Sequence, residues 1–331
     1  MMSRAAAACV ALAAAGCGGT QSMLNPVGPQ ARSIAGLTWW FFGVCAVVYV
    51  AVMGALFWAV ARRGRPADTR PDVDRRLGRV VAGALGLTVL TLVGLTLASV
   101  SAGRSLEPPS AKAAVTVDVI GHQWWWDFQY NNEDRPIENV DSPNELHLPA
   151  GVPVTIRAKS ADVIHSFWVP NLRGKRDLIP PNVTYLWIQA DRPGVYRGQC
   201  AEFCGHQHAH MAFPVVVESM DDFQRWLHAQ RQAARPPATD TEKRGQDVFM
   251  SGPCVLCHTI RGTSAGSGNG PDLTHVSSRR TLAAGTLPNT PDHLADWIAD
   301  PQAIKPGSLM PPNVMGREDL QALVAYLGAL K

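Results

Sequence analysis

The stretch Cys200-Ala-Glu-Phe-Cys204-Gly-His-Gln-His208-Ala-His-Met211 gathers thiol, imidazole and thioether side chains within one short segment. Soft ligands of this kind select copper over hard cations such as calcium or magnesium. A mononuclear blue-copper site uses one Cys, two His and an axial Met, whereas this stretch offers two Cys four residues apart. Two thiolates can bridge two copper ions, each with one terminal His, so the pattern predicts a two-copper centre. The second terminal His is best assigned to His165 in Asp162-Val-Ile-His-Ser-Phe167.

A structural zinc site at Cys200 and Cys204 is the competing interpretation of the same residues. It would leave Met211 and the aromatic segment Gly121-His-Gln-Trp-Trp-Trp-Asp127 without a role. We interpret the additional histidines, His206 and His210, as bystanders.

Short segments in which apolar and polar residues alternate surround this stretch, between residues 112 and 218. The alternating apolar positions are Val115, Val117, Val119, Val152, Val154, Ile156, Val183, Tyr185, Trp187, Val215 and Val217. Turn signals such as Asp191-Arg-Pro-Gly194 separate the segments, and short strands broken by turns predict an all-β sandwich or barrel. A helix is expected over about 220–231, with Ser219 as its N-cap. We therefore assign residues 112–230 to one β domain.

The remainder of the chain is predicted to be a linker and an all-α domain. Residues 231–240 include two consecutive prolines, which stop a helix and indicate the linker. Helices are expected over about 241–250, from Pro291, where Thr290 can cap the first turn, and over about 317–330. The helical domain thus covers residues 241–331.

The motif Cys254-Val-Leu-Cys257-His258 in this domain is that of a c-type haem attachment site. Two thiols add to the two vinyl groups of the haem, and the adjacent His reaches the iron. A zinc site would need a second pair of ligands, and the domain has no other cysteine. The sixth ligand should be a Met from a later loop, because Met opposite His raises the haem potential. Met310 in Pro306-Gly-Ser-Leu-Met-Pro-Pro312 is our choice, and Met315 is the rival.

Two uncharged runs near the N-terminus predict a transmembrane hairpin over residues 30–104. The run between Arg32 and Arg62 and the run Val80–Gly103 each exceed the roughly 20 residues that span a bilayer. We expect helices over about 34–61 and 80–101. The connecting stretch is rich in arginine, so the positive-inside rule places it in the cytoplasm and every residue after 104 outside. The chain is therefore expected in a bacterial cytoplasmic membrane, in contact with lipid.

The first residues have the layout of a secretory signal peptide, which we assign to residues 1–16. Ala-Ala-Gly-Cys ending at Cys17 resembles a bacterial lipoprotein signal and makes Cys17 a lipidation candidate. The whole chain has 46% hydrophobic and only 17% charged residues, which excludes disorder and is typical of membrane segments. A net charge of +3 with no basic block interleaved with aromatics excludes nucleic acid as a partner.

The motifs together resemble cytochrome c oxidase subunit II with a fused class I cytochrome c. The pattern Cys-x-Glu-x-Cys-Gly-x-x-x-His-x-x-Met, the aromatic segment 121–127 and the hairpin before it carry the resemblance to subunit II and its copper centre, called CuA. The resemblance to cytochrome c rests on Gly245, Phe249, Gly270-Pro-Asp-Leu273, the Met-Pro loop and Tyr326. The implied fold is a transmembrane hairpin, a cupredoxin-like β-sandwich and an all-α cytochrome domain.

The resemblance also implies residue roles. Cys200 and Cys204 would bridge two coppers, His165 and His208 would be terminal ligands, and Met211 and the Glu202 carbonyl would be weak ligands. The Glu202 carboxylate would help to hold a magnesium at the interface with subunit I. Trp124 matches the tryptophan through which electrons reach the copper, and Pro271 would pack beside the haem ligand His258. Many subunits II carry a Glu at the start of the second membrane helix, near a proton channel. This chain has Arg75-Arg76-Leu-Gly-Arg79 there, so that role is not carried over.

We therefore expect an electron relay within a cytochrome c oxidase. A soluble or membrane-bound cytochrome c would reduce the haem, and the electron would pass through the copper pair to subunit I. Dioxygen reduction in subunit I, coupled to proton translocation, would lie outside this chain, and subunit III is a further expected partner. Two alternatives stay open here: a nitric oxide reductase subunit with the same cofactors, and a free-standing copper and haem carrier lipoprotein.

Overall fold

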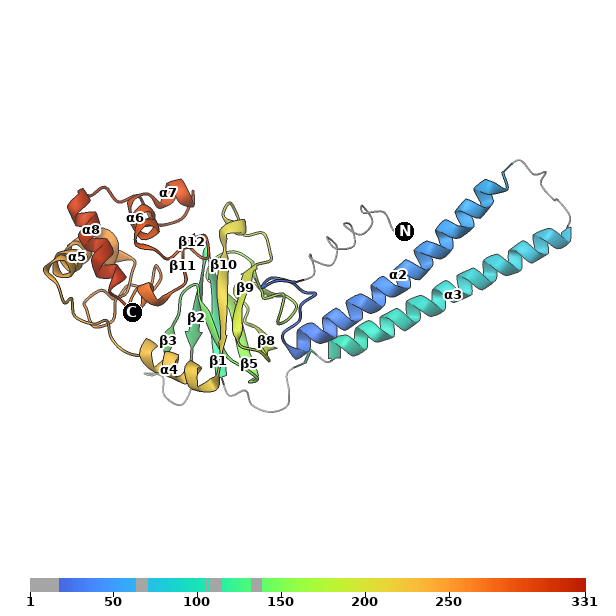
Figure 1. Cartoon of the computed structure of the whole chain (residues 1–331), viewed down its shortest axis with the longest axis horizontal. Helices are drawn as coiled ribbons and strands as arrows, with labels where there is room; N and C mark the ends of the chain where they lie inside the picture. The colour runs from blue at the N-terminus through green and yellow to red at the C-terminus, as the bar shows by residue number, and fades with distance from the viewer. Residues whose placement is uncertain (1–17, 64–70, 105, 108–114, 132–138) are drawn as a thin grey trace, which may run out of the picture. The chain divides into compact units, whose positions relative to one another are not determined.

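The structure of the protein is a computed structural model (Figure 1) that describes residues 18–63, 71–104, 106–107, 115–131 and 139–331. The predicted signal peptide and the lipidation candidate Cys17 lie outside the described residues. The chain forms two compact units, one made of residues 32–107 and the other made of the parts of the chain that flank it.

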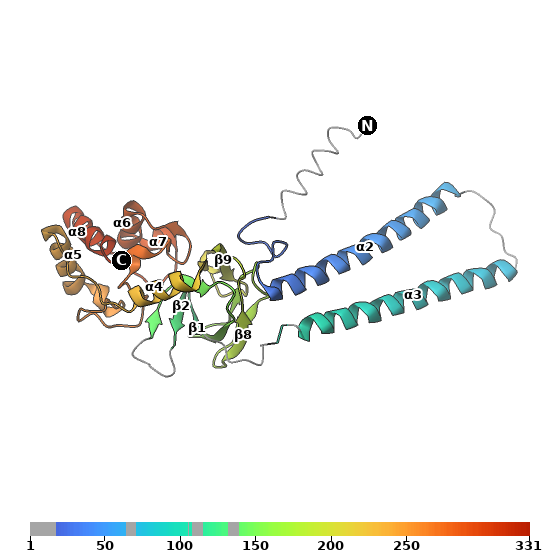
Figure 2. The same cartoon turned by 60° about the horizontal axis from the view of Figure 1, so that its bottom comes forward.

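Helices α2, Pro29–Ala61, and α3, Pro71–Arg104, form the first unit and run antiparallel to each other (Figures 1 and 2). Their large apolar side chains are exposed along most of the two helices, and both helices are long and apolar enough to cross a membrane. The hydroxyls of Thr88, Thr91 and Thr96 each donate to the carbonyl four residues earlier. A lipid-facing helix must satisfy its polar groups internally in this way, because lipid offers no partner.

Both helices begin earlier in the chain than the start of the uncharged runs predicted. The first begins at Pro29 and not at about 34, and the second begins at Pro71 and not at about 80. Asp72 and Asp74 occupy the first turn of α3, where a negative charge complements the positive end of the helix dipole. The arginines that follow are compatible with a helix, so charge marks the edge of the membrane but not the end of the helix.

Ten strands of the second unit form a sandwich of two five-stranded sheets, with the orders β3-β2-β1-β5-β8 and β4-β10-β9-β6-β7. The strands are β1 Val115–His122, β2 Trp125–Tyr130, β3 Val140–Asp141, β4 Leu146–Pro149, β5 Val154–Ser160, β6 His165–Trp168, β7 Arg176–Leu178, β8 Thr184–Ile188, β9 Gly194–Cys200 and β10 Ala212–Glu218. Strand β1 pairs antiparallel with β2 and parallel with β5. The alternating pattern predicted these strands, because every second residue faces the other sheet.

Aromatic rings fill the space between the two sheets. The ring of Phe213 lies 5.3 Å from that of Trp126 and 5.0 Å from that of Phe128, between centroids. Gly198 on the neighbouring strand makes this possible, since a Cβ there would lie 2.2 Å from Phe213 Cζ. The core thus extends directly to the end of the sandwich where β6 begins and β9 ends.

Helix α4, Met220–Gln230, follows the sandwich and is capped by Ser219, as the sequence predicted. The linker after it and the end of α4 both contact the helical domain. Ala234 N donates to Arg261 O, and the Arg261 guanidinium donates to Gln230 O. The linker is therefore part of the packed unit.

The C-terminal domain is built from helices α5, Asp240–Ser251, α6, Pro291–Ala299, α7, Pro301–Ile304, and α8, Arg317–Gly328, with short 3₁₀ turns at 253–256 and 276–278. Helices α5 and α8 cross where Gly245 leaves no room for a side chain: a Cβ there would lie 2.0 Å from Ala322 O. A two-stranded hairpin, β11 Thr281–Leu282 and β12 Leu287–Pro288, also occurs in the domain predicted to be all-α. Its turn places Ala283, Ala284 and Gly285 at positive φ, which two alanines did not signal.

The predicted order of two apolar helices, a cupredoxin-like β-sandwich and a helical cytochrome domain is confirmed. Backbone hydrogen bonds connect the last two within the second unit. Ala212 N donates to Ala284 O at 3.0 Å, and Arg280 N donates to the buried Glu145 carboxylate at 2.9 Å. The β11–β12 hairpin, missed in the sequence, is thus part of the surface that joins the two domains.

Candidate functional site

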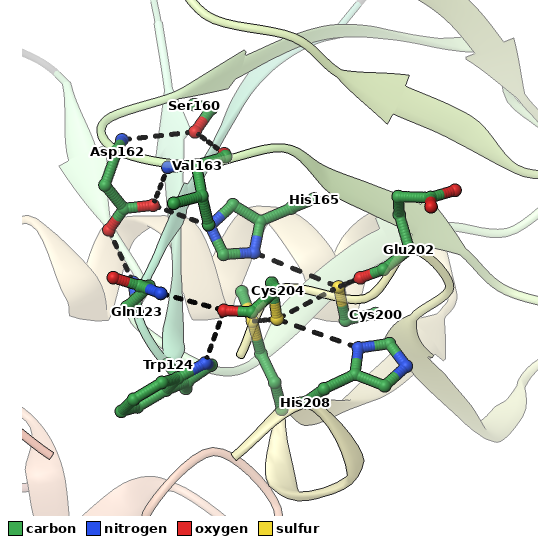
Figure 3. Close-up of polar contacts among 11 residues, drawn as sticks. Gln123, Trp124, Ser160, Asp162, Val163, His165, Cys200, Glu202, Cys204 and His208 are labelled. Atoms are coloured by element: carbon green, nitrogen blue, oxygen red, sulfur yellow. Dashed lines mark hydrogen bonds and ion pairs between the residues drawn. The ribbon is translucent and has the colours of Figure 1, made fainter. Parts of the chain in front are cut away.

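The predicted copper ligands meet at one end of the sandwich (Figure 3). His165 begins β6, Cys200 ends β9, and Cys204, His208 and Met211 lie in the loop before β10. Their donor atoms form a continuous chain of contacts. The two Sγ atoms are 3.8 Å apart, His165 Nδ1 is 3.9 Å from Cys200 Sγ, and His208 Nδ1 is 3.6 Å from Cys204 Sγ. Met211 Sδ lies 3.8 Å from Cys204 Sγ, and the Glu202 carbonyl lies 3.2 Å from Cys200 Sγ.

This cluster has the chemistry of a soft metal site. His165, Cys200, Cys204 and Met211 are almost fully buried. Among the described residues, His165, Cys200 and Cys204 form the only group of three or more His, Cys or acidic residues whose ligand atoms converge. The hydrogen bond between the thiols lowers the pKa of Cys200 to about 3 and raises that of Cys204. Buried thiol, imidazole and thioether donors in contact with one another are the soft ligands that copper prefers, so the residues fit copper.

Asp162 orients the His165 imidazole. Its carboxylate accepts hydrogen bonds from His165 Nε2 at 2.7 Å and from the backbone N–H of Gln123 and Val163, both at 2.6 Å. Because Nε2 donates, the unprotonated Nδ1 faces Cys200. A partner that fixes the tautomer of a ligand imidazole is a regular feature of metal sites. Asp162 has no predicted role in the sequence, although its place three residues before His165 is the signal that could have identified it.

Glycine at position 121 gives the His165 ring its space. A Cβ on Gly121 would lie 2.8 Å from His165 Cδ2, because β1 passes directly beside the imidazole. The need for space beside His165 explains why a glycine begins the aromatic segment 121–127.

The predicted bystander histidines and the magnesium ligand lie around this cluster. The imidazole that contacts Cys204 belongs to His208 and not to His206 or His210, and His210 Nδ1 contacts Gln207. The Glu202 carboxylate is half-exposed and lies 3.9 Å from Lys175 Nζ. Its role with magnesium stays a prediction.

The helical domain contains a cavity of about 290 Å³ lined by Cys254, Cys257, His258 and Met310. The His258 Nδ1–H donates to the carbonyl of Pro271 at 2.8 Å, so Nε2 is free for a metal. Burial lowers the pKa of His258, which favours the neutral imidazole that iron requires. Two thiols, a neutral imidazole and a thioether in one mainly apolar cavity fit a covalently bound haem.

The structure separates the two candidate sixth ligands. Met310 lines the cavity, whereas Met315 packs against the apolar core of the helical domain. Met250 packs there too, as expected for a residue close to the attachment motif. The geometry therefore supports Met310.

Trp124 touches both sites. It lies in the tight connection between β1 and β2, and its indole Nε1–H donates to the Cys204 carbonyl at 2.9 Å (Figure 3). The same side chain lines the cavity of the helical domain. One buried ring thus connects the ligand loop of the copper site with the haem cavity.

Lys305 is a residue of this region that sequence reasoning missed. It is almost fully buried, lines the cavity and donates to the carbonyl of Trp124. A single lysine after a short helix carries no sequence signal, because surface lysines are common at such positions.

Two long apolar helices, a buried thiolate cluster and a cavity with a c-type haem motif in one chain are typical of subunits of membrane redox complexes. Residues 115–220 match the family model of the periplasmic domain of cytochrome c oxidase subunit II, and residues 242–331 match that of cytochrome c. Cytochrome c oxidase subunit 2 of Alkalihalophilus pseudofirmus is 33% identical over 96% of this chain and 93% of its own. This chain belongs to the cytochrome c oxidase subunit II family.

The chain is also similar to two further proteins. Quinol oxidase subunit 2 of Bacillus cereus is 29% identical over 66% of this chain and 76% of its own. The crystal structure of the periplasmic domain of cytochrome oxidase subunit II of Bradyrhizobium japonicum is 27% identical, covers 37% of this chain and 97% of its own, and has a TM-score of 0.35. The predicted family and the assignment to an oxidoreductase complex are confirmed, and the two matched domains imply copper and haem c.

Proposed function

We propose that the chain relays electrons from a cytochrome c donor, by way of haem c and a binuclear copper A centre, to the haem of oxidase subunit I. Subunit I reduces dioxygen and couples the reaction to proton translocation. The observation that carries the proposal is the presence of two complete sets of ligands in one chain, with Trp124 in contact with both. When bound, the two cofactors supply one-electron redox chemistry, and the protein supplies position and potential.

In this proposal the Cys200 and Cys204 thiolates would hold two coppers together with two imidazoles. His165 and His208 supply these imidazoles, while Met211 and the Glu202 carbonyl are weak ligands. The support is the chain of donor contacts between 3.2 and 3.9 Å and the burial of the sulfurs. Asp162 holds the His165 ring and limits its movement, which suits a site that must change oxidation state with little rearrangement.

For the haem we propose that Cys254 and Cys257 would hold it covalently and that His258 and Met310 would supply the ligands of its iron. The Pro271 carbonyl holds the His258 ring through Nδ1. The buried Trp124 side chain lines the cavity on the side of the copper domain. Its indole N–H fixes the ring against Cys204, so we assign it the connection between the sites.

The proposed partners are oxidase subunits I and III, a soluble or membrane-bound cytochrome c, and lipid around α2 and α3. The β-sandwich and the cytochrome domain lie on the outer side of the bacterial cytoplasmic membrane. A lipid on Cys17 and a magnesium held partly by Glu202 at the subunit I interface complete the proposal. The haem type of subunit I is a property of the partner and is identified by extracting the haems from the purified complex.

The first test replaces Cys200 by Ser in the assembled oxidase. We expect covalent haem to be retained, copper to be lost and oxygen consumption with a cytochrome c donor to stop. Cys45→Ser is the matched control, because Cys45 is an exposed residue of α2 far in sequence from either ligand set. Unchanged oxygen consumption in Cys200→Ser would refute the relay. Extraction of the haems from the same preparation identifies the haem type of subunit I.

A further inference from the structure

Lys305 places a buried amino group between the copper domain and the haem cavity. Its side chain is 2% exposed. Nζ donates to the carbonyls of Trp124 and His210, both at 2.7 Å, and to the carbonyl of Ala283 at 3.1 Å. Two of these acceptors belong to the β-sandwich domain and its ligand loop, and the third belongs to the β11–β12 hairpin of the cytochrome domain.

The three acceptors suit an ammonium group. An ammonium has three N–H donors, and three carbonyls satisfy all of them, whereas a neutral amine could satisfy only two. Among the described residues, no carboxylate forms an ion pair with Lys305, and the three backbone carbonyls are its hydrogen-bond partners. Burial lowers the pKa of Lys305 to about 7, and the nearby Cys204 opposes that shift. Burying an ammonium without a carboxylate partner is costly, so the three carbonyls must compensate for its lost hydration.

The residues that follow Lys305 are seated on the same surface. Gln207 Nε2 donates to Pro306 O at 2.8 Å. A Cβ on Gly307 would lie 3.7 Å from the Trp124 ring, so the backbone of this turn covers the indole. The loop then continues to Met310, which lines the haem cavity. Lys305 and the turn after it therefore contact both Trp124 and the copper ligand loop, and the same turn leads into the loop that carries Met310.

We propose that Lys305 is a positioning residue for electron transfer within the chain, which fixes the cytochrome domain on Trp124 and stabilises the reduced state of both centres by its charge. This inference rests on the proposed function. A positive charge close to a redox centre favours the form that carries the additional electron, and the effect is strong where water is excluded. The geometric role should be visible in the rate of haem-to-copper transfer, and the charge should be visible in the midpoint potentials.

The test uses Lys305→Met in the complete oxidase at pH 6, where the lysine of the parent protein is charged. The haem is reduced rapidly by a small donor, and reduction of copper is followed optically. We expect covalent haem and copper to be retained, reduction of the haem by the donor to be unchanged, and haem-to-copper transfer to fall at least tenfold. The midpoint potentials of both centres should fall, which a loosened contact alone would not cause.

Two further variants make the result decisive. Lys243→Met removes an exposed lysine of α5 that pairs with Asp240, and it should leave all rates unchanged. Lys305→Gln keeps two donors without the charge, so it should recover part of the rate but not the potentials. It also replaces Lys305→Met if that variant does not assemble.

The outcomes separate this inference from the proposed function. Equal transfer rates and potentials in the parent protein and in the Lys305 variants, with both metals bound, would overturn the role of Lys305 only. Absence of haem-to-copper transfer in the parent protein would instead overturn the proposed relay.

Discussion

Gly121→Ala is predicted to damage the copper site while leaving the haem site intact. The new Cβ would lie 2.8 Å from Cδ2, 3.0 Å from Cγ and 3.2 Å from Cβ of His165. Ordinary van der Waals contact begins at about 3.4 Å, so the ring or β1 must move by roughly 0.6 Å. The ring has little freedom, because Asp162 holds Nε2 on one side and Cys200 lies beyond Nδ1.

The size of the effect follows from the tolerance of metal sites. Ligand distances are maintained to within about 0.2 Å, so the required shift is well outside that range. Disturbing the residues that orient a ligand typically costs about 10–100-fold in metal affinity, and we expect a loss of copper affinity of that order. Overpacking of the core should cost a further ~1–3 kcal/mol of stability.

The assay is the ratio of copper to covalent haem in the purified oxidase, together with the EPR spectrum of the copper. Gly268→Ala is the matched control, because a Cβ at this exposed position meets nothing within 4 Å. Gly270→Ala is the reciprocal variant: its Cβ would lie 3.0 Å from His258 Cε1, so it should disturb the haem and spare the copper. A normal copper content and an unchanged EPR spectrum in Gly121→Ala would refute the reasoning.

Met310→Leu should keep the covalent haem, lower its redox potential and allow carbon monoxide to bind the iron. Met315→Leu should leave the potential unchanged and should not allow carbon monoxide to bind. Redox titration and a carbon monoxide binding assay distinguish the two variants. Gly245→Ala should lower the thermal stability of the cytochrome domain, because the clash of a Cβ 2.0 Å from Ala322 O outweighs the roughly 1 kcal/mol gain in helix propensity. Thermal unfolding followed by haem absorbance measures the change. An unchanged midpoint would contradict the prediction. Burial raises the pKa of Asp127 to about 7 from about 4 in the unfolded chain, so the folded state binds the additional proton and stability should decline as pH rises from about 4 to 7. Asp127→Asn should remove that decline in denaturation of the oxidase at several pH values, and an identical pH slope would exclude Asp127 as its source.

The candidate copper ligands could be picked out in the sequence because most of them are local. Cys204, His208 and Met211 belong to one loop between adjacent strands, and their spacing alone restricts the chemistry. His165 is 35 residues from Cys200, yet few histidines lie upstream in the domain. The haem motif is likewise local, and the proline-rich loop around Met310 favoured that residue in the sequence; the fold adds that Met310 lines the cavity whereas Met315 packs in the core.

What the sequence could not predict are features created when segments distant in the chain come together. Lys305 has no local pattern, and its meaning comes from carbonyls 95 and 181 residues away along the chain. The β11–β12 hairpin depends on two alanines with positive φ, a conformation that contacts with the sandwich support through the Ala212–Ala284 hydrogen bond. Local sequence propensity does not indicate the burial of Lys305 or the conformation of the hairpin, because tertiary contacts determine both.

The linker and the contact surface together argue for a donor domain that is held in place. A flexible tether would raise the local concentration of the cytochrome domain but would still require an encounter for each electron. Here the linker backbone bonds to the cytochrome domain at Ala234, and Gln232 O lies 3.1 Å from His275 Nε2. The hairpin and the Lys305 turn then bond to the sandwich. With both ends fixed, electron transfer between the centres becomes a property of the folded chain, so its rate should be independent of protein concentration and viscosity.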